Sequence, residues 1–471
     1  MRYVSTRGEA PVLSFVEAML TGLAHDGGLY VPTAWPRLEV DTIAGFAGRP
    51  YAEVAVEVMR PFIGNEIADY DLARIARDAY GNFRHPAVAP LMQFGVSDFV
   101  LELFHGPTLA FKDIAMQFVG RLMDLVLTAR GERTTIVVAT SGDTGAAAID
   151  AFRGRPRADV FVLFPKGRIS DVQRRMMTTP PEKNVHALAI EGTFDDCQSI
   201  VKGMFSHHAF CEEVRLSGVN SINWARIIAQ VVYYFTSAVA LGSPLRKVAF
   251  TVPTGNFGNI YAGYVALRMG LPVDRLVIAT NINDILTRTV ATGSYDLREV
   301  RPTTSPSMDI QVASNFERLL FEVYDRDAQA VRTVMGTLAQ SGRFSLSARA
   351  LSAVRTLFSA DRTDEEETGA SMRTMLRETG HFIDPHTAVG VAVSEKETRD
   401  PSIPMIVLGT AHAAKFPAAV KAACGLRPSL PEWLADLDQR TERVTRLPAD
   451  QIAVEKLILS RSRAAQAGAA A

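Results

Sequence analysis

The stretch "VVATSGDTGAAAIDAF" at residues 137–152 indicates the fold most directly. A short apolar run ends at Thr140, small residues follow, and an alanine-rich run begins near Asp143 or Thr144. This order predicts a β-strand, a tight turn and an α-helix. Backbone N–H groups at the start of such a helix, with Ser141 and Thr144 beside them, suit a carboxylate or phosphate.

Strand-like runs of the same kind recur on both sides of this stretch. They are "FVLELF" from 99, "TTIVVAT" from 134, "DVFVLFP" from 159, "VHALAIEG" from 185, "KVAFTVPTG" from 247, "RLVIATN" from 275 and "PMIVLGT" from 404. They alternate with segments of helical pattern, which predicts an α/β fold with mostly parallel sheets covered by helices. Ligands of such sheets bind beyond the carboxyl ends of the strands.

The length of 471 residues predicts two or three folded units. We expect a mostly helical N-terminal domain at residues 1–90 and a catalytic region at 91–430, within which about 110–225 form a smaller mobile subdomain. Residues 431–471 form a C-terminal extension, and the composition of its tail, "RSRAAQAGAAA", predicts fraying. The apolar residues 227–242 include Gln230 and Thr236, which favours a buried core helix over a membrane span.

Charge and cysteine content narrow the classes of function. The formal net charge of −1 gives no general attraction to nucleic acid or to an anionic membrane. Cys197, Cys211 and Cys424 form no paired framework and no CxxC motif, which favours a reducing compartment and no structural metal. The N-terminus lacks the apolar core of a signal peptide, so we expect a cytoplasmic protein.

A second glycine-rich turn follows another predicted strand, in "AFTVPTGNFGNIYAGYVAL" at residues 249–267. Glycines at 255 and 258 let the backbone close around phosphate oxygens at the start of the next helix. Neither turn has the lysine of a Walker loop or the dinucleotide G-x-G-x-x-G pattern. Each could be only a tight connection, but two of them could hold the two ends of one ligand.

Lys112 lies among apolar residues in "LELFHGPTLAFKDIAMQF" at residues 101–118. If it points into a partly dry cleft, its pKa falls and its neutral amine becomes a nucleophile toward carbonyls. A carbonyl cofactor that carries a phosphate would need this lysine and a phosphate-binding turn. The alternative is a surface lysine paired with Asp113.

Five segments together resemble, in order and spacing, the threonine synthases. They are "FHGPTLAFKD", "ATSGDTGAA", "SINWARIIAQ", "VPTGNFGNIYAG" and "LGTAHAAKF", and the resemblance runs from about residue 3 to about residue 425. The opening "YVSTRG" resembles the longer branch of that family. The family implies pyridoxal 5'-phosphate (PLP) as cofactor and the PLP-dependent fold type II, similar to tryptophan synthase β, with two α/β subdomains around a cleft.

The resemblance assigns cofactor contacts to particular residues. Lys112 matches the family's Schiff-base lysine, and Thr410 matches the hydroxyl residue near the pyridine nitrogen. The residues that match the cradle of the cofactor phosphate donate through their backbone: Gly255, Asn256, Phe257, Gly258 and Asn259. Asp143 falls beside the expected cofactor 3-oxygen, where many relatives in the wider fold type have asparagine. An aspartate there would repel a phenolate unless one proton is shared, so its role stays open.

The substrate contacts follow in the same way. The residues that match the loop for the substrate carboxylate and part of its phosphate are Thr140, Ser141 and Thr144. Those that resemble the segment holding the substrate phosphate are Ser221, Asn223 and Arg226, and Arg226 could instead be a salt-bridged helix residue. We interpret His105 and His412 as hydrogen-bonded turn residues, and Asp384 as a helix cap.

The implied reaction converts O-phospho-L-homoserine and water to L-threonine and phosphate by γ-elimination and β-addition of water. The implied catalytic residue is Lys112, the implied oligomeric state is a monomer, and no metal is expected. A serine or threonine dehydratase or a β-replacement synthase is the nearest alternative. A phosphoamino-acid sensor with little catalysis is a second one, of a different class.

Overall fold

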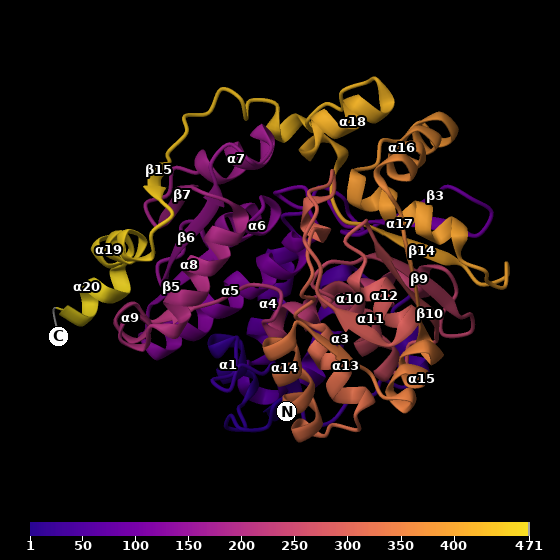
Figure 1. Ribbon diagram of the computed structural model, residues 1–471, viewed down its shortest axis with the longest axis horizontal. Coiled ribbons are helices and arrows are strands. Elements are labelled where there is room, and N and C mark those ends of the chain that lie inside the picture. The colour runs from indigo at the N-terminus through magenta and orange to yellow at the C-terminus, as the bar shows by residue number, and fades with distance from the viewer. Residues whose placement is uncertain (470–471) are drawn as a thin grey trace.

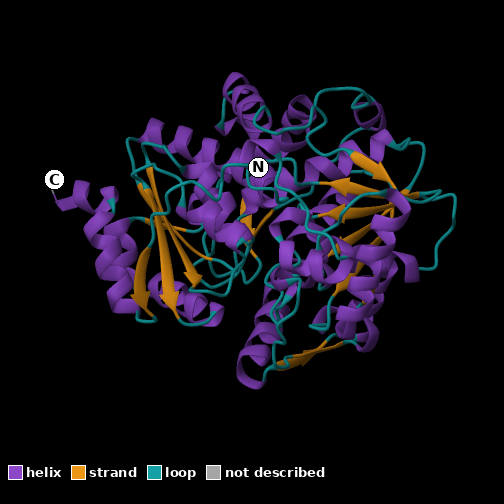
Figure 2. Cartoon of the chain, turned by 90° about the horizontal axis from the view of Figure 1, so that it is seen from above, coloured by secondary structure: helices purple, strands orange, loops and turns teal. Residues whose placement is uncertain are grey.

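The computed structural model of the protein describes residues 1–469 and contains two separate sheets, one on each side of the molecule (Figure 2). The larger sheet has the strand order β13-β10-β9-β14-β4-β3, and only the β3–β4 pair in it is antiparallel. The smaller sheet has the order β15-β7-β6-β5-β8 and is parallel throughout. The architecture is therefore the α/β fold that the alternation predicts.

The strands of the larger sheet are β3 (Leu91–Gln93), β4 (Asp98–Glu102), β9 (Val248–Pro253), β10 (Val273–Thr280), β13 (Phe358–Arg362) and β14 (Met405–Gly409). Those of the smaller sheet are β5 (Thr134–Ala139), β6 (Ala158–Pro165), β7 (Val185–Glu191), β8 (Leu216–Ser217) and β15 (Thr445–Pro448). Two short antiparallel pairs complete the strands: β1 (Tyr3–Ser5) with β2 (Tyr30–Pro32), and β11 (Ser294–Asp296) with β12 (Arg343–Ser345).

Helices cover the sheets and fill the space between them (Figure 1). The helices of the first half of the chain are α1 (Phe15–Thr21), α2 (Val40–Ala44), α3 (Tyr51–Ile63), α4 (Asp69–Tyr80), α5 (Lys112–Arg130), α6 (Asp143–Phe152), α7 (Asp171–Thr178), α8 (Phe194–Ser206), α9 (His208–Val214) and α10 (Trp224–Ala240). Those of the second half are α11 (Gly258–Arg268), α12 (Ile285–Thr292), α13 (Phe316–Val323), α14 (Ala328–Ser341), α15 (Ala348–Leu357), α16 (Glu365–Thr379), α17 (Pro385–Lys396), α18 (Pro417–Cys424), α19 (Gln451–Arg461) and α20 (Arg463–Ala469). Short 3-10 helices lie at Gly64–Glu66 (η1), Pro306–Met308 (η2), Ala413–Lys415 (η3) and Glu432–Leu434 (η4).

Each of the apolar runs singled out in the sequence contains a strand of one of the two main sheets. β6, for example, is buried along its whole length, because a central parallel strand is covered on both faces. α10 is buried almost all round, which confirms a core helix for residues 227–240 of the predicted 227–242. Among the described residues, no helix is both long and apolar enough to cross a membrane.

The N-terminal helices share a core with the rest of the chain. The Trp224 ring of α10 packs against the rings of Tyr3 and Phe62, with centroids 6.0 and 5.8 Å apart. The same continuous cluster of buried side chains includes Phe257, beside the second glycine-rich turn. Residues 1–90 therefore support the two α/β halves directly.

The C-terminal segment joins the smaller half. β15 pairs in parallel with β7, and the side chains of Val454 and Ile458 in α19 belong to the core beneath that sheet. Residues 463–469 of the tail form α20. There Ala464 and Ala465 are buried, and Arg463 Nε lies 2.7 Å from Asp159 Oδ1. Residues 470 and 471 lie outside the described part of the chain.

Candidate active site

The candidate residues lie just beyond the carboxyl ends of strands in both sheets. Thr140 follows β5, the turn at residues 254–259 follows β9, and Thr410 follows β14. The segment after β4 leads to Lys112, and Phe111 N–H donates to the Thr410 carbonyl at 2.9 Å. This is the edge at which ligands of parallel sheets bind.

Lys112 begins α5 and is only 8% exposed. Its Nζ lies 4.8 Å from the centroid of the Phe111 ring and 3.7 Å from Asp143 Oδ2. Burial lowers the pKa of Lys112 to about 8, although Asp143 pulls in the opposite direction. The alternative of an exposed lysine paired with Asp113 is wrong, because the Asp113 carboxylate accepts from the Thr108 hydroxyl at 2.6 Å and from the Thr108 N–H at 2.8 Å.

Asp143 has a second basic neighbour, Lys415, that sequence reasoning missed. The Lys415 side chain is fully buried, and its Nζ lies 2.8 Å from Asp143 Oδ1. Gln173 Nε2 donates to the same oxygen at 3.0 Å. Despite its burial, Asp143 has a pKa far below the usual range, chiefly because of Lys415 and then of Lys112. The two lysines therefore favour the ionised form of the carboxylate. The signal that could have found Lys415 was a lysine inside the small-residue and apolar run "AHAAKF".

The turn at residues 254–259 forms a tight backbone loop before α11. Phe257 adopts a left-handed φ of 63°, and Tyr261 N–H donates to its carbonyl at 3.0 Å. The N–H groups of Gly258 and Asn259 precede that first helical bond and point out of the helix start. A Cβ at Gly255 would lie 2.5 Å from the Ser307 carbonyl oxygen, so this position requires glycine.

The turn at residues 140–145 is closed by a buried hydroxyl. Thr140 Oγ1 accepts from the N–H groups of Gly142 and Gly145, each at 2.9 Å. Thr140 therefore shapes the turn, while Ser141 and Thr144 remain half-exposed at the start of α6. Gly142 has φ 133°, and a Cβ there would meet the Gln173 side chain at 2.4 Å.

Arg226 is a buried cation without a carboxylate partner in the described part of the chain. It is 2% exposed, its Nη1 donates to the Val219 carbonyl at 3.2 Å, and its Nε has no partner among residues 1–469. The alternative of a salt-bridged helix residue is therefore wrong. Burial lowers the pKa of Arg226 to about 10, and its charge in turn helps to lower the pKa of Lys112.

The neighbours of Arg226 at the start of α10 have different roles. Asn223 caps this helix, because its Oδ1 accepts from Ala225 N–H at 3.0 Å and its Nδ2 donates to the carbonyls of Met19 and Gly218. Its side chain is occupied by these structural bonds and is not free for the predicted phosphate contact. Ser221 is half-exposed beside the second glycine-rich turn, since its carbonyl oxygen would lie 3.6 Å from a Cβ at Gly258.

Thr410, His105 and His412 are the remaining candidate residues near Lys112. Thr410 N–H donates to Thr387 Oγ1 at 3.2 Å, and Thr387 in turn bonds to Asp384, which caps α17 as predicted. The His105 ring lies 2.7 Å from Glu102, and His412 caps η3, so both are the turn residues that the sequence indicated.

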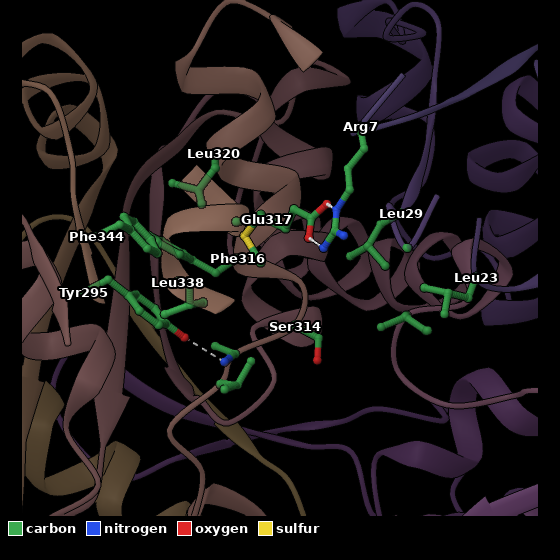
Figure 3. A pocket seen from close by; sticks show the side chains of 15 residues that line it. Arg7, Leu23, Leu29, Tyr295, Ser314, Phe316, Glu317, Leu320, Leu338 and Phe344 are labelled. Atoms are coloured by element: carbon green, nitrogen blue, oxygen red, sulfur yellow. Dashed lines mark hydrogen bonds and ion pairs between the residues drawn. The ribbon is translucent and has the colours of Figure 1, made fainter. Parts of the chain in front are cut away.

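A separate cavity of about 200 Å³ lies away from these residues (Figure 3). The ion pair between Arg7 and Glu317 borders it on one side, and the rings of Tyr295, Phe316 and Phe344 border it on another. None of the predicted catalytic or cofactor residues lines it. The candidate site is thus assigned by its charges and turns, not by the shape of this cavity.

Known proteins similar to this chain identify its family. The family described as "Threonine synthase N terminus" matches residues 2–80, "Pyridoxal-phosphate dependent enzyme" matches residues 93–341, and "Threonine synthase, C-terminal" matches residues 387–458. A threonine synthase from Pseudomonas aeruginosa is 51% identical over 459 residues, which are 97% of this chain and 98% of that protein. The chain belongs to the threonine synthase family. It is also a member of the PLP-dependent enzymes, which confirms the predicted family and fold class.

Solved threonine synthase structures agree with this membership. The crystal structure of PLP-bound threonine synthase from Brucella melitensis has a TM-score of 0.96 and 59% identity, and the match covers 98% of this chain and all of that one. The yeast threonine synthase structure has a TM-score of 0.92 and 39% identity, and the match covers 98% of each chain. The family's architecture therefore extends over nearly the whole of this chain.

The residues present fit a phosphorylated pyridine aldehyde. A buried lysine with a lowered pKa can condense with an aldehyde, and the crowded Gly255 turn with its free N–H groups can take a phosphate. The unpartnered Arg226 Nε adds a cation for a further anion. This set of donors matches the cofactor of the family.

Proposed function

We propose that the chain converts O-phospho-L-homoserine and water to L-threonine and phosphate, as the family membership implies. The observation that carries this proposal is the juxtaposition of a buried amine, Lys112, with a buried cation, Arg226, that has no carboxylate partner among residues 1–469. The Lys112 amine can accept a proton from a substrate carbon, and the Arg226 guanidinium can bind a substrate phosphate. The substrate of a serine or threonine dehydratase carries no phosphate, so such an enzyme would need no second buried cation for one.

PLP, when bound, supplies an electron sink for negative charge that develops at the substrate carbons. The backbone N–H groups of Gly255, Asn256, Gly258 and Asn259 would hold its phosphate, whereas the N–H of Phe257 already donates to the Gly255 carbonyl at 2.8 Å. Asp143 and Thr410 would lie near its ring, and the neutral Thr410 hydroxyl would favour protonation of the ring nitrogen less than an aspartate. Lys112 would hold the aldehyde carbon.

Lys112 Nζ moves the protons. With a pKa near 8 it can accept a proton from a substrate carbon at neutral pH and return it later. Its position at the start of α5, beneath the end of β14, fixes the direction from which it approaches. The half-exposed hydroxyls of Ser141 and Thr144 bind the substrate carboxylate at the positive end of α6.

Departure of phosphate needs positive charge that is already in place. Arg226 supplies a guanidinium that is fixed by its burial and by the Val219 carbonyl, so no reorganisation is required during the reaction. Ser221 contributes a hydroxyl nearby. Closure of the smaller half would keep water out until phosphate has left, after which one water adds at the β-carbon.

We further propose that the protein is monomeric and cytoplasmic. The monomer follows from the resemblance to the longer branch of the family, and the three cysteines, all free thiols, suit a reducing compartment. Light scattering of the purified protein and fractionation of the source cells test the two statements.

The test is an assay of inorganic phosphate and L-threonine released from O-phospho-L-homoserine, with and without added PLP. We expect both products in equal amounts, and only when the cofactor is present. L-Threonine and L-serine serve as control substrates, because a dehydratase would release ammonia and an oxo acid from them. Ammonia from threonine without phosphate from phosphohomoserine would overturn the proposal, as would saturable binding without product.

A further inference from the structure

Asp143 sits between two lysines, and its two oxygens face different ones. Oδ1 lies 2.8 Å from Lys415 Nζ, whereas Oδ2 lies 3.7 Å from Lys112 Nζ. Lys415 is fully buried, but the Lys112 side chain retains 10% of its exposure. The closer and more enclosed partner of the carboxylate is therefore Lys415.

We propose that Lys415 is a positioning residue that takes up the negative charge of Asp143, so that Lys112 is left without a counter-ion of its own. This inference rests on the proposed function, because it concerns the amine that acts there. An acid paired only with Lys112 would stabilise the ammonium form and hinder proton transfer. The ammonium group of Lys415, on the other side of Asp143, weakens the stabilisation of the Lys112 ammonium by Asp143. It also repels a positive charge on Lys112 directly.

Hydrogen bonds from both halves of the molecule hold Lys415 and Asp143 in register. Lys415 Nζ also donates to the Thr108 carbonyl at 2.6 Å, four residues before Lys112. The Lys415 carbonyl accepts from Ser170 Oγ at 2.8 Å. Ser170 caps α7, and Gln173 of the same helix donates to Asp143 Oδ1. These bonds fix Asp143 independently of Lys112.

The charged groups around Lys112 come from several elements. Asp143 belongs to α6, Lys415 to η3 and Arg226 to α10, and His386 of α17 acts on Asp143 in turn. Asp113 follows Lys112 on α5, but its carboxylate is occupied by Thr108. Burial lowers the pKa of Lys112, Asp143 raises it, and Lys415 and Arg226 lower it further. The pKa of Lys112 thus depends on how far the Asp143 carboxylate is neutralised by its ion pair with Lys415.

The experiment is a double-mutant cycle with Lys415→Met and Asp143→Asn in the PLP-loaded protein. The first readout is the pH midpoint of the visible absorbance of the bound cofactor. Removal of a nearby cation raises the pKa of a titrating group, and removal of a nearby anion lowers it. We therefore expect the midpoint to rise by about one pH unit in Lys415→Met and to fall in Asp143→Asn. In the double variant it should return close to the wild-type value.

The second readout is the denaturant midpoint of unfolding, which depends on neither substrate nor turnover. Lys415→Met leaves a buried carboxylate without its closest cation, so we expect a large loss of stability that Asp143→Asn restores in the double variant. If Lys415→Met does not fold, the double variant must still fold. Lys421→Met, on the exposed face of nearby α18, is the matched control and should change neither readout.

The inference is overturned if the two single variants shift the absorbance midpoint in the same direction. It is equally overturned if their stability losses simply add, or if the double variant fails to fold. Failure of the proposed function would look different, because the wild-type protein would then release no phosphate while the charge coupling persisted.

Discussion

At the scale of one residue, burial of the Lys112 amine lowers the stability of the folded chain. Burial lowers its pKa to about 8 from an ordinary value of 10.5. Between these two pH values the unfolded chain binds the proton that the folded chain lacks, so stability rises with pH through this window. Below about pH 8 the folded protein carries the whole penalty of a buried ammonium.

Replacement of Lys112 by methionine should therefore abolish turnover and yet stabilise the cofactor-free protein. At pH 7 we expect the free energy of unfolding to increase by up to about 3 kcal/mol. The gain should shrink as the pH rises through the window between about 8 and 10.5, where the wild-type lysine loses its proton. Denaturant unfolding of both proteins at neutral and at alkaline pH checks this. A variant that is less stable than the wild type at pH 7 would contradict it.

Sequence alone predicted Lys112 and its charged neighbours Asp143 and Arg226 as site residues, but not Lys415. Lys112 has a local signature, a lysine after an apolar run and a Gly-Pro break, and the family resemblance named it. Lys415 also lies in an apolar and small-residue run, but that run does not reveal its partner Asp143, which is distant in the sequence and is brought close only by packing of the two halves. The lysines that surround Asp143 become visible only in three dimensions.

At the scale of elements, the buried strands were predictable and the edge strands were not. The central strands read as continuous apolar runs, whereas β13 has the sequence "FSADR" and β15 has "TRLP". Both lie at the edges of their sheets, where one side faces no further strand and polar residues are tolerated. The two glycine-rich turns were predictable because their backbone geometry demands small residues.

Gly255→Ala tests the second of these turns. The added Cβ would lie 2.5 Å from the Ser307 carbonyl, and Ser307 is itself held by His386 Nε2, which accepts from its N–H at 3.3 Å. We expect the turn to shift and the affinity for PLP to fall at least about ten-fold, with a loss of about 1–3 kcal/mol in stability.

The matched control is Gly336→Ala in α14, where no atom lies within 4 Å of the added Cβ. This change should leave PLP affinity unaltered and stabilise the helix by roughly 0.5–1 kcal/mol. Fluorescence titration with PLP measures both affinities. Equal affinities for the Gly255 variant and the wild type would remove this turn from the cofactor site.

At the scale of the whole molecule, buried polar contacts fasten the N-terminal helices to the catalytic region. Arg318 of α13 is fully buried, and it donates to the Tyr30 carbonyl at 3.0 and 3.1 Å and to the Ile222 carbonyl at 2.6 Å. It also bonds to Asn315, whose amide donates to the carbonyls of Asn256 and Ser221. One side chain thus connects the N-terminal unit, the substrate segment and the cofactor turn.

Arg318→Met should loosen all three parts at once. The Tyr30 and Ile222 carbonyls would lose their charged donor, and an unsatisfied buried acceptor costs about 1–3 kcal/mol, so we expect a loss of about 3 kcal/mol or more. The affinity for O-phospho-L-homoserine should fall as well, because Ile222 directly follows Ser221, whose hydroxyl we assign to the substrate phosphate. The control is Arg349→Met, which breaks an exposed ion pair with Asp325 and should cost less than about 1 kcal/mol. Denaturant midpoints and substrate titrations of the two variants decide the matter: similar losses in both would mean that Arg318 does not join these parts.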